Sequence, residues 1–315
     1  MGRFKANLIT GGGVFPDLRA DFSVANANKI VSLAADASKL SPDTLGVEVD
    51  EVDLMRWKPL SSQLTNIVYM LVKTDSTQVS ESLLQSIIRF KRLEFLHLQC
   101  RNAREISAGI ASLTNVHNLR YLGIQAPSAT RIDRAIYCSS NVEELWLYLT
   151  KIDLPSGVSQ MSHLDGLEVW SRRTNSVQAF PPDLMASKIK YLGVFNVSNV
   201  DLLLPVLPPD LRQFDAMGCT LKSLPARWLN HTNLHFLRLD HDHITVFPAD
   251  LSRLPALRLL SLDLNDISIV PPLQTQNTNL CISLVDNPLR RIAPVSERLI
   301  DQYSIQKYRL KNAAR

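Results

Sequence analysis

Residues 234–242 and 257–265 decide the fold: they read Leu-His-Phe-Leu-Arg-Leu-Asp-His-Asp and Leu-Arg-Leu-Leu-Ser-Leu-Asp-Leu-Asn. Both segments follow the pattern L-x-x-L-x-L, and a polar residue stands three positions after the last leucine. In a short strand, alternate side chains point to opposite faces, so the second and third leucines enter a core together while their neighbours face solvent. Each segment therefore predicts one short strand with one buried face.

The pattern recurs along most of the chain at a nearly constant period. Eight copies begin between residues 93 and 257, separated by 22 to 26 residues. Two weaker copies precede them, at residues 45–50 and 67–75, and a shortened copy follows at 282–287. One such unit cannot bury its apolar face alone, whereas stacked units join their faces into a continuous core. We therefore expect about eleven stacked strands.

This repeat resembles that of the leucine-rich-repeat family, from about residue 42 to residue 289. The resemblance implies an α/β fold: a right-handed horseshoe solenoid with a parallel β-sheet on its concave face and loops and short helices on its convex face. It also implies a small polar residue in the turn after each strand, a position held here by Asp75, Thr150, Cys219, Asp242, Asn265 and Asn287. The position departs from the family pattern, and predicts irregular turns, at Arg101, Pro127, Arg172 and Val197.

Proline marks the other side of most repeats. An apolar residue followed by proline recurs after the strands, as in Leu154-Pro155 and Phe247-Pro248, and proline suits an extended entry or the first turn of a short helix. The repeats that start at 67 and 93 lack this proline, and residues 81–90 instead predict a true helix. We expect loops and brief helical turns on the convex face.

The two ends of the array need caps, because a terminal repeat otherwise leaves an apolar face open. Residues 1–41 show no recognisable cap, and we assign them no fold. Residues 290–315 predict a capping helix, because Leu299, Ile300, Tyr303 and Ile305 stand among charges. This last segment is basic, which fits either a solvated cap or a contact with a membrane surface or an acidic partner.

Composition argues for a folded protein and against several classes of function. Of 315 residues, 45% are hydrophobic and 20% are charged, as in folded soluble chains. A net charge of +4 is too small to indicate nucleic-acid binding, and no apolar run is long enough for a membrane span. The four cysteines form no C-x-x-C pair and no terminal cluster, and residues 1–27 do not form a signal peptide. We therefore expect a cytoplasmic location, with an extracellular or membrane-tethered one as the alternative.

A row of large side chains is the most informative feature of the predicted concave face. The residue directly after the third core position is Tyr148, Trp170, Phe195 and Met217 in four successive repeats, and Trp146 stands beside the first of them. Such a row has two interpretations: mutual packing that stiffens the sheet, or a patch that binds a partner. Aromatic residues one position before the second core residue are assigned to packing alone; they are Tyr69, Phe95, Tyr121, Tyr191 and Phe236.

The same face becomes charged toward the C-terminal end. Asp215, Arg238, Asp240 and Asp263 occupy neighbouring solvent-facing positions, and they predict either plain solvation or a contact with a charged partner. Residues 240–243 read Asp-His-Asp-His, but consecutive strand residues point to opposite faces and the spacing matches no known metal motif. We predict no metal and no cofactor.

No catalytic motif is present, since Gly11-Gly12-Gly13 lacks the Lys of a phosphate-binding loop and no G-x-S-x-G occurs. The sequence therefore predicts a non-enzymatic scaffold or signalling module that binds another protein on its concave face. The alternative is the ligand-sensing part of a larger receptor or receptor kinase whose catalytic domain is not in this chain.

Overall fold

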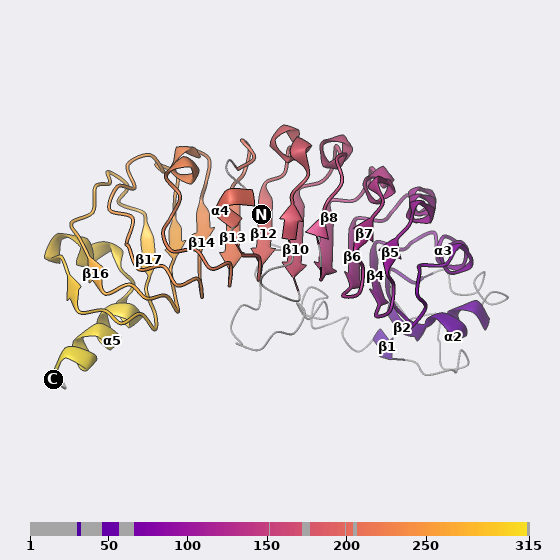
Figure 1. Ribbon diagram of the computed structural model, residues 1–315, viewed down its shortest axis with the longest axis horizontal. Coiled ribbons are helices and arrows are strands. Elements are labelled where there is room, and N and C mark those ends of the chain that lie inside the picture. The colour runs from indigo at the N-terminus through magenta and orange to yellow at the C-terminus, as the bar shows by residue number, and fades with distance from the viewer. Residues whose placement is uncertain are drawn as a thin grey trace.

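Figure 1 shows the computed structural model, which describes residues 30–32, 46–56, 66–150, 152–171, 177–198, 200–203 and 207–313. Its main feature is one parallel sheet in which every strand lies beside the next main strand of the chain. The twelve strands of this sheet are β1 (Ile30–Ser32), β2 (Gly46–Asp50), β3 (Tyr69–Thr74), β4 (Phe95–Cys100), β6 (Tyr121–Ala126), β8 (Glu144–Leu149), β10 (Gly166–Ser171), β12 (Tyr191–Phe195), β13 (Gln213–Met217), β14 (Phe236–Arg238), β15 (Leu259–Ser261) and β17 (Cys281–Ser283).

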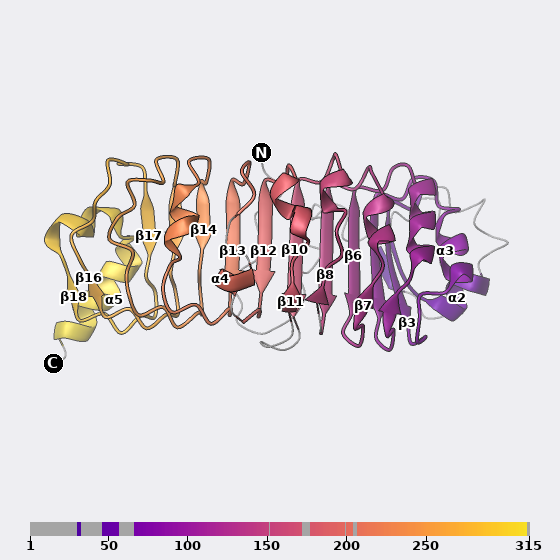
Figure 2. The same cartoon turned by 45° about the horizontal axis from the view of Figure 1, so that its top comes forward.

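This sheet confirms the leucine-rich-repeat solenoid. The eleven expected strands correspond to β2 through β17 of the sheet, and the sheet also contains β1, which lies in the segment left without a fold. The strands follow one another along an arc with the short helices on its outer side (Figures 1 and 2). The rest of residues 1–41 and the predicted irregular turn at Arg172 lie outside the described residues.

The outer, convex side differs between repeats. It carries α2 (Glu51–Arg56) and α3 (Glu81–Ile87) first, and Ser80 caps α3 by accepting a hydrogen bond from the amide of Leu83. Short 3₁₀ helices follow: η3 (Ala108–Asn115), η4 (Arg134–Cys138), η5 (Val158–Gln160), η6 (Pro182–Ala186) and η7 (Ala226–Asn230), with α4 (Val200–Leu203) between the last two. Three two-stranded sheets join neighbouring repeats: β5 (Glu105–Ile106) with β7 (Arg131–Ile132), β9 (Ile152–Asp153) with β11 (Val177–Ala179), and β16 (Ile269–Val270) with β18 (Arg291–Ile292).

The strands change length along the array, and the backbone that follows them changes with it. Strands β3, β4, β6, β8 and β10 have six residues, and the sixth is buried; these residues are Thr74, Cys100, Ala126, Leu149 and Ser171. From β12 onward the equivalent residue has a positive φ and lies outside the strand; these residues are Asn196 (57°), Gly218 (66°), His241 (62°), Leu264 (55°) and Asp286 (59°). Arg101 and Pro127 thus follow a longer strand, and the turn of the C-terminal repeats does not form there. Asp75 and Thr150 also follow six-residue strands, so the polar residue alone does not decide the turn. Val197 follows the positive-φ residue Asn196, as in the C-terminal repeats, so the expectation of an irregular turn at Val197 is wrong.

The core runs through the whole array as one cluster. The leucines of L-x-x-L-x-L are buried, as in the repeat of Leu234, Leu237 and Leu239, each of which is 0% exposed. Burying a leucine side chain stabilises the fold by about 1.5–3 kcal/mol. Because each repeat contacts mainly its neighbours, the stability of the array is approximately a sum of local terms.

The C-terminal end continues as η8 (Pro294–Leu299) and α5 (Gln302–Ala313). Between them, Ile300 pairs with Ile282 of β17, and the amide of Asp301 donates to the carbonyl of Ile282 at 2.9 Å. The hydroxyl of Ser304 accepts a hydrogen bond from the amide of Leu284 at 2.9 Å. This segment therefore meets the backbone groups that the last strand would otherwise leave unpaired.

Candidate functional site

The strand pairing puts the predicted large side chains into one row on the concave face. Tyr148 of β8 pairs with Trp170 of β10, Trp170 pairs with Phe195 of β12, and Phe195 pairs with Met217 of β13. Adjacent strands lie about 4.8 Å apart, so this row, which we call the aromatic ridge, is about 15 Å long. The register expected from the sequence is therefore the one in the structure.

Trp146, beside the ridge, is buried rather than exposed. Its neighbour on β6 is Gly123, and a side chain there would stand 2.7 Å from Nδ1 of His97, which leaves the space above Gly123 to His97 and Trp146. The rings of His97 and Trp146 lie 5.1 Å apart, and Trp146 is 2% exposed. Burial lowers the pKa of His97 to about 4, so its ring is neutral at physiological pH. The expectation that Trp146 presents exposed surface is wrong.

A second glycine organises the middle of the ridge. Gly193 of β12 has no side chain, and a Cβ there would stand 2.6 Å from the hydroxyl of Tyr191 and 2.6 Å from the ring of Phe195. The Tyr191 hydroxyl donates to Glu168 at 2.9 Å, and the indole N–H of Trp170 donates to the same carboxylate at 3.0 Å. These contacts hold Trp170 in one orientation.

Phe195 completes this arrangement. Its ring stacks on Trp170 with a centroid distance of 4.0 Å, and it is only 4% exposed, so it too is buried, contrary to expectation. Tyr148 lies nearly parallel to Trp146 at 6.4 Å. Tyr148, Trp170 and Met217 are half-buried and form the accessible part of the ridge.

Beyond the ridge, Asp215 is also buried, at 1% exposure. The side-chain amide of Gln213 donates to it at 2.9 Å, and the guanidinium of Arg238 lies 3.8 Å away. Burial raises the pKa of Asp215 to about 7, against the opposing effect of Arg238. Asp215 is therefore an internal partner of Arg238 and not the solvated acid that the sequence suggested.

Asp240 and Asp263 connect successive repeats. Asp240 accepts hydrogen bonds from the hydroxyl of Ser261 at 2.6 Å and the amide of Asp263 at 2.9 Å. Asp263 repeats this arrangement one strand later, with Ser283 at 2.6 Å and the amide of Val285 at 2.7 Å. Burial raises the pKa of Asp240 to about 6 and also raises that of Asp263. Both carboxylates thus satisfy backbone and hydroxyl donors of the next repeat.

The turn residues form a ladder behind the concave face. Asn265 accepts from the amides of Asp242 and Ile244 and donates from its own amide to the carbonyl of Leu239 at 2.7 Å. Asn287 makes the same bonds one repeat later, to the amide of Ile267 and the carbonyl of Leu262. In the preceding repeat the position is Asp242, a buried carboxyl whose Oδ1 accepts from the amide of Cys219.

Asp242 therefore belongs to the ladder and not to a metal site with its neighbours. His241 and His243 are exposed, and His243 lies 3.1 Å from Asp266. The described part of the chain contains no group of three or more His, Cys, Asp or Glu side chains placed to hold a metal ion.

The residue directly before each strand forms a second row, which we call the rim row and which the sequence interpretation missed. Its members are Glu94, Arg120, Glu143, Asp165, Lys190, Arg212, His235 and Arg258. Arg120 pairs with Glu143 at 2.9 Å, and Lys190 pairs with Asp165 at 2.6 Å. The row contains both acidic and basic residues from Glu94 to Asp165, and from Lys190 onward its members are Lys, Arg and His.

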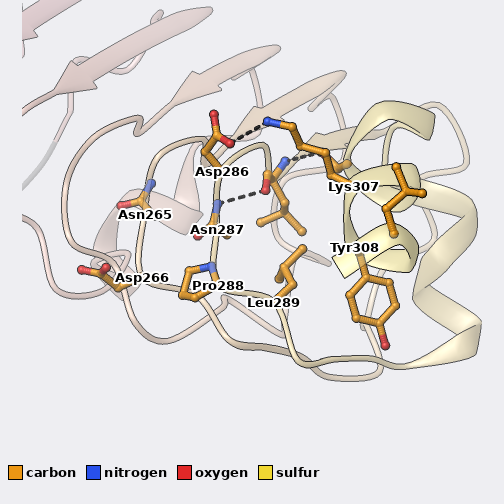
Figure 3. A pocket seen from close by; sticks show the side chains of 11 residues that line it. Asn265, Asp266, Asp286, Asn287, Pro288, Leu289, Lys307 and Tyr308 are labelled. Atoms are coloured by element: carbon orange, nitrogen blue, oxygen red, sulfur yellow. Dashed lines mark hydrogen bonds and ion pairs between the residues drawn. The ribbon is translucent and has the colours of Figure 1, made fainter. Parts of the chain in front are cut away.

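A cavity of about 630 Å³ lies at the C-terminal end, between the last turns and α5 (Figure 3). Its charged groups are already engaged: Lys307 binds Asp286 at 2.6 Å, and Asp266 is close to His243. Asn265, Asn287 and Ser304 on its wall bond to the backbone. This cavity therefore belongs to the cap.

No protein-family model matches the chain, and no curated protein matches it by sequence. Several solved structures are similar to it. A leucine-rich-repeat protein of Leptospira interrogans is 15% identical, with a TM-score of 0.47, over 85% of this chain and 88% of its own. The protein InlP of Listeria monocytogenes is 17% identical, with a TM-score of 0.48, over 76% of this chain and 62% of its own. Human 5T4, the trophoblast glycoprotein, is 14% identical, with a TM-score of 0.41, over 80% of each chain.

Among the described residues, no helix has the length and apolar character needed to cross a membrane.

Proposed function

We propose that this leucine-rich-repeat protein is a non-catalytic interaction module that binds a protein partner on its concave face. The observation that carries the proposal is the aromatic ridge. Its residues occupy the solvent-facing positions of strands β8 to β13, which the core of the repeats does not require. Large, rigid side chains of this kind are enriched where protein partners bury surface.

The geometry of the ridge supports this role. Trp170 is fixed by its stacking on Phe195 and by its hydrogen bond to Glu168, and Tyr148 lies along Trp146. A side chain that is already held in place loses little rotamer freedom on binding, so less of the contact energy is spent on ordering. The buried residues Trp146 and Phe195 act as supports, and Tyr148, Trp170 and Met217 provide the contact surface.

The test is a double substitution, Tyr148→Ala with Trp170→Ala, compared with the wild type in affinity capture followed by identification of the bound proteins. Tyr303→Ala, which removes an aromatic side chain that is 56% exposed on α5, is the matched control. We expect the double variant to stay folded by circular dichroism and to lose a partner that the control retains. Retention of every wild-type partner by the folded double variant would contradict the proposal.

A further inference from the structure

We infer that the C-terminal part of the rim row binds an acidic segment of a protein partner, with an apolar side chain of that segment seated on Phe236. The site consists of Arg212, His235, Arg258 and Phe236, and we call it the basic rim. This inference rests on the proposed function, because it names the partner chemistry for the same module. It concerns a different part of the concave side from the aromatic ridge.

The two arginines of the basic rim form no ion pair with another described residue. In the rim row, Arg120 and Glu143 neutralise one another, as do Lys190 and Asp165. No carboxylate pairs with Arg212 or Arg258 in the part of the chain that the structure describes, and both residues are exposed. The strand order puts His235 between them. The backbone amide of His235 donates to the carbonyl of Arg212 at 2.8 Å, and the amide of Arg258 donates to the carbonyl of His235 at 2.8 Å.

Arg212 and Arg258 leave their hydrogen-bond donors to solvent in the free protein. The two guanidinium groups are two strands apart, about 10 Å, so a short acidic segment can reach both. An incoming carboxylate forms charge-assisted hydrogen bonds with the guanidinium N–H groups. Charge complementarity therefore favours an acidic occupant.

Phe236 is more exposed than the aromatic residues at the same position of other repeats. Three aromatic residues at the same position of other repeats are buried: Tyr69 is 3% exposed, Tyr121 8% and Tyr191 6%. Phe95 is half-buried and Phe236 is 37% exposed, so packing alone does not cover the ring of Phe236. Its strand neighbours are Gln213 and the half-buried Leu259, and its amide donates to the carbonyl of Arg212. The strand register thus puts an exposed phenylalanine between the strands that follow Arg212 and Arg258.

The acids of the concave face do not neutralise this site. Asp240 lies five residues after His235 along its repeat, about 16 Å away, which exceeds the screening length of about 8 Å at physiological salt. Asp240 and Asp263 are also engaged by Ser261, Ser283 and backbone amides. Asp215 is taken by Gln213 and Arg238.

The same acids favour a peptide over a nucleic acid. A nucleic acid carries a negative phosphate on every nucleotide. A nucleic-acid strand that extended from the basic rim across the concave face would bring phosphates close to Asp240 and Asp263, which would repel them. A peptide can place its acidic residues at the rim and different residues farther along.

The experiment measures fluorescence anisotropy of a short labelled peptide in which glutamates flank one phenylalanine, titrated with the full chain at low and at physiological salt. We expect binding that weakens as salt rises. The variant Arg212→Glu with Arg258→Glu should weaken it on the order of tenfold, since two attractive contacts become repulsive. Phe236→Ala should weaken it with an unchanged salt dependence.

The control variant is Arg290→Glu with Arg291→Glu, which makes the same charge change at exposed positions in and beside β18. An equal loss in this control would overturn the inference, and so would equal binding of a lysine version of the peptide. Tight binding of single-stranded DNA that competes with the peptide would also overturn it, in favour of a general anion site.

The partner recovered by affinity capture separates this inference from the proposed function. If a partner is lost with Tyr148→Ala and Trp170→Ala but retained by Arg212→Glu with Arg258→Glu, the result supports the proposed function and contradicts binding at the basic rim. If the peptide binds the basic rim but the ridge variant keeps every partner, the result contradicts partner binding at the aromatic ridge and supports binding at the basic rim.

Discussion

Replacing Asp242 by Asn should stabilise the protein, and the gain should grow as the pH rises from 5 to 7. Asp242 is 0% exposed, and burial raises the pKa of its carboxyl from 3.8 to about 8, against hydrogen bonds from the amides of Cys219 and Leu221. Its second oxygen, Oδ2, has no hydrogen-bond partner in the described part of the chain. Asn265 and Asn287 use the equivalent atom, an amide nitrogen, to donate to the carbonyls of Leu239 and Leu262. An asparagine at 242 should donate in the same way to the carbonyl of Ala216.

The sign of the pH effect follows from the direction of the shift. Because the folded protein holds the proton of Asp242 more tightly than the unfolded chain, its contribution is fully present below about pH 4 and is lost as the pH rises to about 8. The loss is about 1.4 kcal/mol per pH unit between these limits. The advantage of Asp242→Asn should therefore increase by up to about 3 kcal/mol between pH 5 and pH 7.

Urea denaturation followed by circular dichroism, at several pH values, measures this advantage. Asp215 and Asp240 also have raised pKa values, but both remain in wild type and variant, so their effects largely cancel in the difference. The reverse change, Asn265→Asp, is the matched control and should destabilise the protein increasingly with pH. A variant no more stable than wild type at pH 7, or an advantage that is flat across the pH range, would refute the reasoning.

Further substitutions test the fold and the site. Leu237→Ala should lower the free energy of unfolding by about 2–5 kcal/mol, because it leaves a cavity in the core, and the conservative Leu237→Met should cost less than half of that in the same denaturation assay. Gly193→Ala should lower the free energy of unfolding by about 1–3 kcal/mol, because the new methyl group would clash with Tyr191 and Phe195. Gly109→Ala is the control and should be close to neutral, because the nearest atom to its Cβ is 3.6 Å away. Equal effects would show that the ridge is not tightly packed. Asp183→Ala should loosen the Gly157–Ser159 loop, because the amides of Gly157 and Ser159 donate to that carboxylate at 2.9 to 3.1 Å. Amide hydrogen exchange in this loop should become faster, whereas exchange at Asn265 should not change. Unchanged exchange in the loop would contradict the role of Asp183 as its anchor.

The repeating pattern was sufficient to predict the sheet, because strand period and repeat period leave little choice of register. Tyr148, Trp170 and Met217 lie in the row that the sequence indicated. Their accessibility was not predictable from that row, because it depends on Gly123 and Gly193, which let His97, Tyr191 and Phe195 fold over the sheet. A column of letters shows which face a side chain occupies, but not whether its neighbours cover it.

The acidic residues show the same limit for charge. Asp215, Asp240 and Asp263 lie on the predicted face, but their contacts with Arg238, Ser261 and Ser283 come from the next strand of the sheet, at least 20 residues away in sequence, and form only when the repeats stack. The basic rim had a sequence signal, since Arg212, His235 and Arg258 occupy one position of successive repeats. This signal lies in the position directly before each strand, whereas the prediction of the site used only positions within the strands.

The change in strand length between β10 and β12 has a consequence for the order in which the array opens. Six-residue strands β3 to β10 share more backbone hydrogen bonds with each neighbour than three-residue strands β14, β15 and β17. In an array held together by nearest neighbours, folding begins where the interfaces are strongest and spreads outward. The segment between β3 and β10 should therefore act as the folding nucleus, and the C-terminal repeats, including the basic rim, should open and close many times before the protein unfolds.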